Sequence, residues 1–268
     1  MPPVLLLHLS DLHFGPNSRF AKQDMKQLGG QMHQAIEEAR REHNIEERVA
    51  LVAVTGDIAE TASKPQYDVA LQFFESLVGS LGVARRCFVF VPGNHDVSWA
   101  ECQKIEGEQK DEEFGLPELE RRIQARKLKR FEGFLNNFYD LKDRPQDRPG
   151  AIALECGAFV HDFAEHLLSV AALNSCETET HQKQGGCVSA EQAQALMTHW
   201  KRPEAEGLMK IILVHHNLAA TVPDNVRDWM TTLRKKVETG TLKQETINHF
   251  VADAVGLSGR EHLLSIVQ

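Results

Sequence analysis

Potential metal ligands follow four short apolar segments of this 268-residue chain. They are Asp11 and His13 after the first segment, Asp57 after the second, Asn94 and His95 after the third, and His215 and His216 after the fourth. Carboxylate, imidazole and amide oxygen together suit Mn²⁺, Fe or Zn²⁺ better than Ca²⁺, which prefers oxygen alone. An aspartate can bridge two ions about 3.5–4 Å apart, and such a pair binds phosphoryl oxygens and generates a hydroxide that attacks phosphorus. These residue types therefore predict metal-dependent hydrolysis of a phosphate ester.

Strands must position these side chains. Segments 4–9, 49–55, 87–91 and 209–214 are short and apolar, and the spacing of apolar residues predicts helices after the first two of them, over 23–42 and 67–81. This alternation of strands and helices predicts an α/β layered fold. Ligands of an open α/β sheet bind beyond the carboxyl ends of its strands, which is where the polar residues occur.

Two later segments interrupt the alternation. Residues 101–120 hold eight acidic side chains and residues 121–130 hold six basic ones. Apolar residues keep helical spacing through 117–140, which predicts one amphipathic helix over the core, within a charged helical insertion at about 100–150. The basic residues form either a solvated helix face, which we favour, or a contact for substrate phosphate. Residues 151–174 alternate in polarity, which predicts a β-hairpin or meander entering a second sheet.

The composition narrows the class of protein. The net charge is −8, whereas a protein that coats nucleic acid usually carries the opposite sign, so extended nucleic acid is not the expected partner. The five cysteines are scattered and form no CxxC pair, which indicates reduced thiols rather than a disulfide framework or a zinc site. No apolar stretch is long enough for a signal peptide or a membrane span. We therefore expect a cytoplasmic protein without a membrane partner.

In order along the chain, the motifs resemble those of the calcineurin-like metallophosphoesterase superfamily. They read Asp-x-His at 11–13, Gly-Asp at 56–57, Gly-Asn-His-Asp at 93–96, His-His at 215–216 and Gly-x-x-His at 259–262. The resemblance runs from Asp11 to His262. It implies a single domain over 1–268, built as a four-layer αββα sandwich of two mixed β-sheets flanked by helices, with the segment at 254–258 as a further strand.

The resemblance also implies a role for each matching residue. Asp11, His13 and His262 would hold the first metal, Asp57 would bridge both metals, and Asn94 and His215 would hold the second. His95 would protonate the leaving oxygen or stabilise the transition state, and Asp96 would orient His95.

One position departs from the family pattern. Arg260 stands where the motif Gly-His-x-His places a ligand of the second metal. A guanidinium stays protonated and has no lone pair for a metal. The second site could bind metal weakly, complete its ligand set with water, or recruit His216. Alternatively, Arg260 binds the substrate phosphate, and His216 is the other candidate for substrate binding.

Within the superfamily, residues 9–15 and 91–97 are most similar to the cyclic-nucleotide phosphodiesterase and nuclease branches, and Asp96 replaces the glutamate usual in protein phosphatases. We therefore expect hydrolysis of a phosphodiester with two divalent ions, preferably Mn²⁺, and we include nucleotides among the candidate substrates. Two alternatives remain. One is a DNA exonuclease-type nuclease. The other is a catalytically weakened module that binds a nucleotide or a partner, either with a trimmed second sheet or within a longer protein, because the chain ends six residues after His262.

Overall fold

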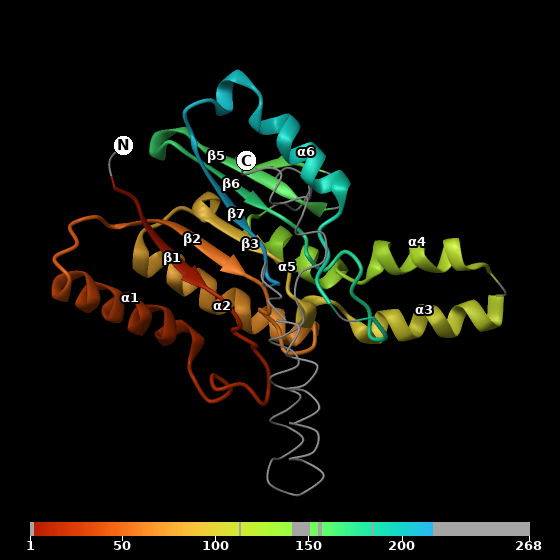
Figure 1. Ribbon diagram of the computed structural model, residues 1–268. Coiled ribbons are helices and arrows are strands. Elements are labelled where there is room, and N and C mark those ends of the chain that lie inside the picture. The colour runs from red at the N-terminus through yellow and green to blue at the C-terminus, as the bar shows by residue number, and fades with distance from the viewer. Residues whose placement is uncertain (1–2, 113, 141–150, 155–156, 184, 217–268) are drawn as a thin grey trace, which may run out of the picture.

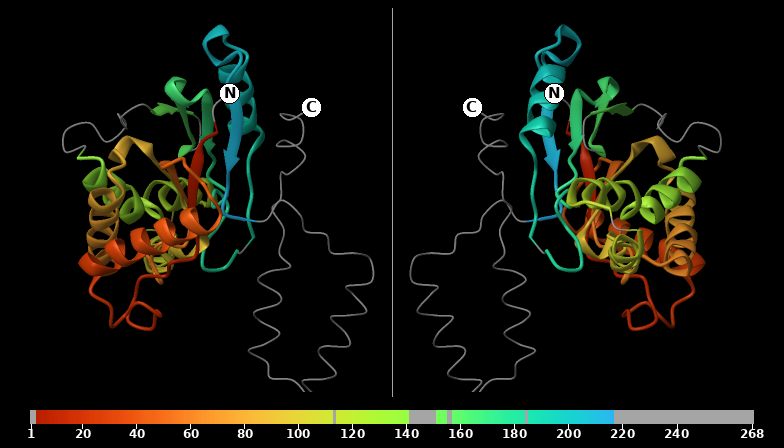
Figure 2. Two further views of the ribbon diagram at one scale, coloured as in Figure 1. Left: turned by 90° about the vertical axis from the view of Figure 1, so that its left-hand side faces the viewer. Right: turned by 90° about the vertical axis from the view of Figure 1, so that its right-hand side faces the viewer.

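The computed structural model describes residues 3–112, 114–140, 151–154, 157–183 and 185–216. In this part of the chain, two β-sheets pack face to face and helices cover both outer faces (Figures 1 and 2). The predicted four-layer αββα arrangement is therefore confirmed. The strand expected at 254–258 lies outside the described residues, as do Arg260 and His262. Among the helices described, none combines the length and the apolar character needed to cross a bilayer.

The first sheet consists of three parallel strands in the order β1 (Leu5–Leu9), β2 (Val49–Thr55) and β3 (Phe88–Val91). Most of β2 and all of β3 are buried, as is typical of strands covered on both faces. Helices α1 (Met25–Glu42) and α2 (Lys64–Leu81) pack against each other beneath this sheet (Figure 1). All pairing among the described strands of this sheet is parallel.

The second sheet is mixed and has the order β4 (Ala151–Ala153), β5 (Phe159–Phe163), β6 (Leu168–Ala172) and β7 (Met209–Leu213). The first three strands are antiparallel, as the predicted meander requires, and β7 runs parallel to β6. Helix α6 (Ala190–Trp200) packs on the outer face of this sheet (Figure 1). Short 3₁₀ turns lie at Arg85–Cys87, Asn94–Asp96, Ala164–His166 and Pro203–Ala205.

In the sequence, the charged segment lies between β3 and β4. It forms α3 (Trp99–Glu112), α4 (Leu116–Arg126) and α5 (Lys129–Phe138). Helices α3 and α4 pair as a hairpin that projects from the sandwich (Figure 1). Helix α5 instead belongs to the main core, where aromatic residues of α2, β3 and α5 pack edge to face. These aromatic residues are Phe74, Phe88, Phe90, Phe134 and Phe138.

The single helix expected over 117–140 is wrong, because the chain breaks between α4 and α5 at Lys127 and Leu128. The Lys127 carbonyl accepts a hydrogen bond from the Ser98 amide at 2.8 Å. This contact joins the two ends of the α3–α4 hairpin at the break. Local periodicity cannot predict it, because the donor lies 29 residues earlier in the chain.

The Lys127 side chain is buried, with 1 % of its surface exposed. Its ammonium donates to the carbonyls of Cys176 at 2.9 Å and Glu179 at 3.2 Å, and also to that of Glu177. An ammonium has three N–H donors, so all of them find acceptors here. Lys127 therefore ties the base of the hairpin to the loop between β6 and α6, residues 173–189, called the β6–α6 loop below. Burial lowers the pKa of Lys127 to about 8.

The arginines of the hairpin, Arg121, Arg122 and Arg126, pair with acidic residues of the same hairpin. Arg122 contacts Glu118 at 2.7 Å, and Arg126 contacts Glu101 at 2.9 Å and Glu108 at 3.1 Å. Such exposed pairs contribute little stability each, but together they neutralise the cluster. The arrangement supports the interpretation of a solvated helix face and leaves these arginines engaged with carboxylates rather than free for phosphate.

We predict that Lys127→Met changes how stability depends on pH. The pKa of Lys127 is about 8 in the folded protein against an ordinary 10.5, because burial disfavours the charge, so the unfolded chain holds this proton more tightly. Stability should therefore rise with pH between about 8 and 10.5, and the substitution should remove that rise. At pH 7 it should also lower the free energy of unfolding by about 2–4 kcal/mol, because buried carbonyls lose their donor.

Urea unfolding at several pH values between 7 and 10 measures both effects. Lys129→Met, at an exposed position two residues away, is the matched control and should follow the wild type. Parallel stability curves for wild type and Lys127→Met across this pH range would contradict the assigned environment.

Candidate metal centre

Three expected ligands have backbone angles that only glycine adopts easily. The φ angles are 55° at Asp11, 46° at His13 and 54° at Asp57. Such left-handed conformations persist where the surrounding structure enforces them, often at functional sites. Here the two loops bond to each other: the Asp11 amide donates to the Gly56 carbonyl at 3.2 Å, and the His13 amide to the Asp57 carbonyl at 2.8 Å. The loops after β1 and β2 thus hold their ligands in one fixed arrangement.

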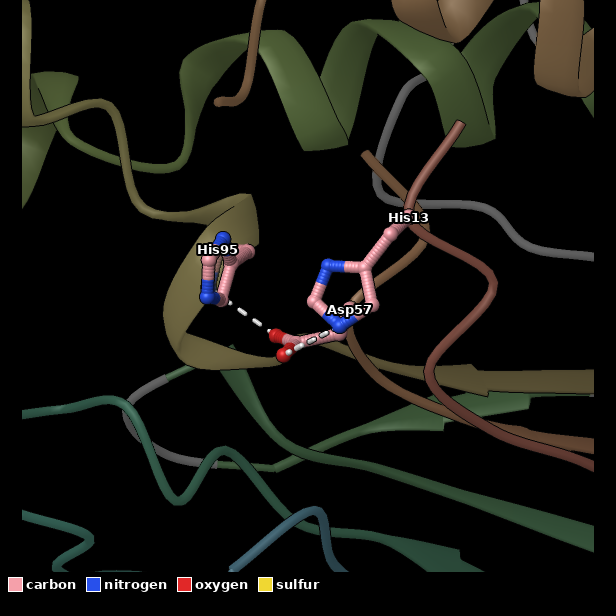
Figure 3. Close-up of side chains that lie close together, drawn as sticks. All are labelled: His13, Asp57 and His95. Atoms are coloured by element: carbon pink, nitrogen blue, oxygen red, sulfur yellow. Dashed lines mark hydrogen bonds and ion pairs between the residues drawn. The ribbon is translucent and has the colours of Figure 1, made fainter. Parts of the chain in front are cut away.

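The Asp57 carboxylate lies at the middle of the site and is 3 % exposed. Its Oδ2 is 3.5 Å from His13 Nε2, and its Oδ1 is 3.5 Å from His215 Nε2. Oδ1 also accepts a hydrogen bond from the His95 amide at 2.9 Å, which fixes the plane of the carboxylate (Figure 3). Each oxygen therefore faces a different imidazole, as a carboxylate shared between two ions would.

The Nε2 lone pair of His215 faces oxygen atoms that are themselves hydrogen-bond acceptors. Its Nδ1 lies 2.9 Å from the Thr55 carbonyl, so this nitrogen carries the hydrogen. In the neutral ring, Nε2 then presents a lone pair to Asn94 Oδ1 at 3.1 Å and to Asp57 Oδ1. Ligand atoms bound to one ion at about 2.1 Å stand about 3.0–3.4 Å apart. Such convergence of lone pairs fits a divalent cation.

Two groups of side chains could each hold an ion, with Asp57 common to both. One group is His13, Asp57 and His95; the other is Asp11, Asp57 and His215, and within each the ligand atoms lie within 4.8 Å of one another. The sequence placed Asp11 and His13 on the same ion, and their side chains are 3.9 Å apart. Burial lowers the pKa of His13 against the opposing charge of Asp57, which favours the neutral ring that a metal needs. The residues present thus fit two ions.

His95 lies beside this centre with a defined tautomer. Its Nδ1 is 2.7 Å from the Glu60 carbonyl, so Nδ1 carries a hydrogen, and Nε2 can release or accept a proton. The ring packs edge-on against that of His13, with centroids 4.6 Å apart (Figure 3). His95 is therefore placed to exchange a proton next to the shared carboxylate.

Asp96 is fully buried and contacts backbone rather than the His95 ring in the hydrogen bonds described. Its carboxylate accepts from the amides of Gly93 at 3.0 Å and Ala59 at 3.1 Å, and from the Tyr67 hydroxyl at 2.9 Å. Burial, together with the charge of Asp57, raises the pKa of Asp96 to about 6. We expect from the sequence that Asp96 orients His95 directly. Instead, Asp96 acts on His95 indirectly, because it fixes the loops that carry His95 and the Glu60 carbonyl.

His216 points toward the β6–α6 loop. Its Nδ1 is 2.8 Å from Ser175 Oγ, and its Nε2 is 3.3 Å from Glu179 Oε1. Both ring nitrogens therefore have protein partners, which does not support His216 as a substitute metal ligand. Its ring still lines the cleft and packs edge-on against that of His215. Arg260 and His262, the other expected contributors, lie outside the described residues.

Several residues that the sequence did not single out also shape the site. Ser10 contacts the Asp11 carboxylate and lies 3.0 Å from the Thr55 carbonyl, and His8 Nε2 is 2.7 Å from Thr55 Oγ1. All three line the same cleft of about 710 Å³ as the metal ligands. Their signal in the sequence was present, since polar residues at positions 8, 10 and 55 interrupt otherwise apolar strand ends.

We predict that Gly93→Ala impairs metal binding. An added Cβ would stand 2.1 Å from Asp57 Oδ1 and 2.3 Å from its amide nitrogen, so the shared carboxylate must move. The number of Mn²⁺ ions bound per chain, and the rise in melting temperature that Mn²⁺ causes, should both fall. Gly79→Ala in α2 is the control, because nothing lies within 4 Å of its added Cβ. Equal Mn²⁺ binding by both variants would contradict the role given to Asp57.

Comparison with known proteins agrees with the geometry. The sequence model of the calcineurin-like phosphoesterase family matches residues 4–232. This range includes every expected ligand that the structure describes. A search of curated proteins finds no match to the chain. The arrangement of ligands and the extent of the family match lead to one conclusion: the chain belongs to the calcineurin-like phosphoesterase family, whose activity is metal-dependent hydrolysis of phosphoesters.

Proposed function

We propose that this protein is a phosphodiesterase that works with two divalent ions, preferably Mn²⁺. The observation that carries the proposal is the placement of Asp57, whose two oxygens face the imidazoles of His13 and His215 at 3.5 Å each. Divalent ions would supply Lewis-acid stabilisation of the phosphoryl oxygens and make water more acidic. Asp11, His13, Asp57, Asn94 and His215 would hold them, as the sequence predicts.

His95 supplies the proton for the leaving group. The Glu60 carbonyl holds a hydrogen on Nδ1, so the protonated ring donates from Nε2 to the departing ester oxygen. Asp96 maintains this geometry because its carboxylate accepts hydrogen bonds from the Gly93 and Ala59 amides. Substrate thus meets a site in which the proton donor and the shared carboxylate are both fixed before binding, which reduces the cost of orientation.

Two observations favour a diester over other phosphate esters, and a third disfavours a long nucleic acid strand as that diester. The third motif ends in Asp96 rather than the glutamate of the protein phosphatases that it otherwise resembles. The cleft of about 710 Å³ extends from the ligands along Leu6, Ala53 and Ile211, which leaves room for two ester substituents. Finally, Arg122 and Arg126 are bound to carboxylates, which disfavours an exonuclease that grips a long strand with this cluster.

A cytoplasmic location fits this proposal. The four cysteines that the structure describes, Cys87, Cys102, Cys176 and Cys187, are free. Free thiols are common where the surroundings are reducing.

We predict that His95→Asn lowers kcat by about 10²–10⁴-fold while Mn²⁺ binding persists, because the proton donor is lost and the ligand set proposed above remains. The loss should shrink for p-nitrophenyl esters, whose leaving group needs little protonation. The assay measures turnover, in the presence of Mn²⁺, of cyclic nucleotides, single-stranded DNA, phosphomonoesters and simple diesters. His43→Asn, at an exposed position in the turn after α1, is the control and should match wild type.

The assay with wild type separates the alternatives. Faster turnover of monoesters than of any diester would overturn the diester proposal, and degradation of DNA from its ends would indicate the nuclease. Lack of turnover for every substrate, with intact Mn²⁺ binding, would indicate a weakened binding module.

We also predict that Arg260→His strengthens binding of the second metal ion. The arginine stands where the family motif has a histidine, and it has no lone pair to offer. Titration with Mn²⁺ should show tighter binding of the second ion and a higher rate in the variant. Unchanged affinity for the second ion and an unchanged rate would mean that Arg260 does not stand in for a missing ligand.

A further inference from the structure

Trp99 is the first residue of α3 and follows the Gly-Asn-His-Asp motif after two buried residues. It is 37 % exposed, whereas Trp200 is 9 % exposed and packed in the core of the second sheet. An indole carries a large apolar surface, so leaving it in water forgoes stabilisation that burial would give. Its exposed position therefore favours a role in binding a ligand.

The Trp99 ring is aligned with the proposed proton donor. Its plane makes an angle of 29° with that of His95, and the ring centroids are 6.5 Å apart. His95 also packs edge-on against His13 of the metal centre, with ring centroids 4.6 Å apart. The order His13, His95, Trp99 thus leads outward from the metal ligands. A planar group stacked on Trp99 would lie alongside His95.

The backbone beneath Trp99 is well anchored, so its exposure does not come from a loose segment. The neighbouring Ser98 is 1 % exposed, and its amide donates to the Lys127 carbonyl at 2.8 Å. Its carbonyl accepts from the Cys102 amide at 3.1 Å, which starts the helix, and Val97 and Cys102 are both buried in one apolar cluster. Trp99 is therefore presented to solvent by a rigid support, which lowers the entropy cost of stacking.

Charge at this position does not favour an ionic ligand. The nearby Glu101 is bound by Arg126 at 2.9 Å and by Arg130 at 3.8 Å. What remains for recognition is the aromatic face of Trp99, and every nucleic acid base has a complementary face. In a nucleotide, a sugar separates the ester oxygen from the base, which suits a platform set beside His95 rather than at the reacting phosphorus.

We propose that Trp99 stacks on the base of a nucleotide whose phosphate occupies the metal centre, so that the substrate is a nucleotide diester. The inference rests on the proposed function and narrows its substrate class. It makes Trp99 a specificity residue that acts on binding, whereas the metal ligands and His95 act on any phosphate ester.

The test compares adenosine 5′-monophosphate with ribose 5-phosphate, which lacks the base, as ligands of the Mn²⁺-loaded protein in calorimetric titrations. Wild type should bind the nucleotide about 5- to 100-fold more tightly, the range that stacking on one aromatic side chain supports. Trp99→Ala should bring the ratio close to one, and Trp99→Phe should keep an intermediate ratio. Leu116→Ala removes another exposed apolar side chain, 69 % exposed, from the same hairpin and should keep the wild-type ratio.

The outcomes separate this inference from the proposed function, because binding is measured without turnover. An unchanged ratio in Trp99→Ala would overturn the stacking role even if diesters are hydrolysed. Equal weakening of both ligands would also overturn it, since that result indicates structural damage to the site. A ratio lost in Trp99→Ala, in a protein that hydrolyses no diester, would support nucleotide binding while the proposed catalytic function fails.

Discussion

The buried carboxylate of Asp57 is the constraint on which the site depends. A 3 % exposed carboxylate must be compensated, and here it receives a hydrogen bond from the His95 amide and faces two imidazoles. These partners come from the loops after β1, β3 and β7, so satisfying one carboxylate brings three strand ends together. Gly93 permits this approach, because any side chain there would overlap the carboxylate. The fold and the site are therefore specified by the same contacts.

Sequence reasoning succeeded where the signal is local. Apolar runs predicted β2 without error and β1, β3 and β7 within one residue at either end, and their polar endings predicted the residues that gather around Asp57. It failed where contacts between residues distant in the sequence determine the local structure. The break at Lys127 and Leu128 coincides with a hydrogen bond from the distant Ser98 amide, and Asp96 binds the Ala59 amide 37 residues away instead of acting on the adjacent His95. The spacing of apolar residues carries no information about such partners.

The projecting hairpin is linked to the metal centre at both of its ends. Helix α3 starts just after the motif that carries Asn94 and His95, and Lys127 at the end of α4 binds three carbonyls of the β6–α6 loop. That loop in turn supplies Glu179, which contacts His216 beside His215. A charged insertion that looked peripheral in the sequence thus supports both sides of the site. Its arginines stabilise the hairpin itself, and its one buried lysine connects the hairpin to the rest of the protein.

The balance of charge explains why a cation belongs in this arrangement. Asp11, Asp57 and Asp96 place three carboxylates within three short loops, after β1, β2 and β3, and the pKa of Asp96 is raised to about 6 by burial and by the charge of Asp57. The pKa of His13 is lowered by burial, so its ring contributes little positive charge at neutral pH. Negative charge and lone pairs therefore accumulate at the same point. Divalent ions relieve that repulsion, and for this reason metal binding and stability of the folded site should be linked.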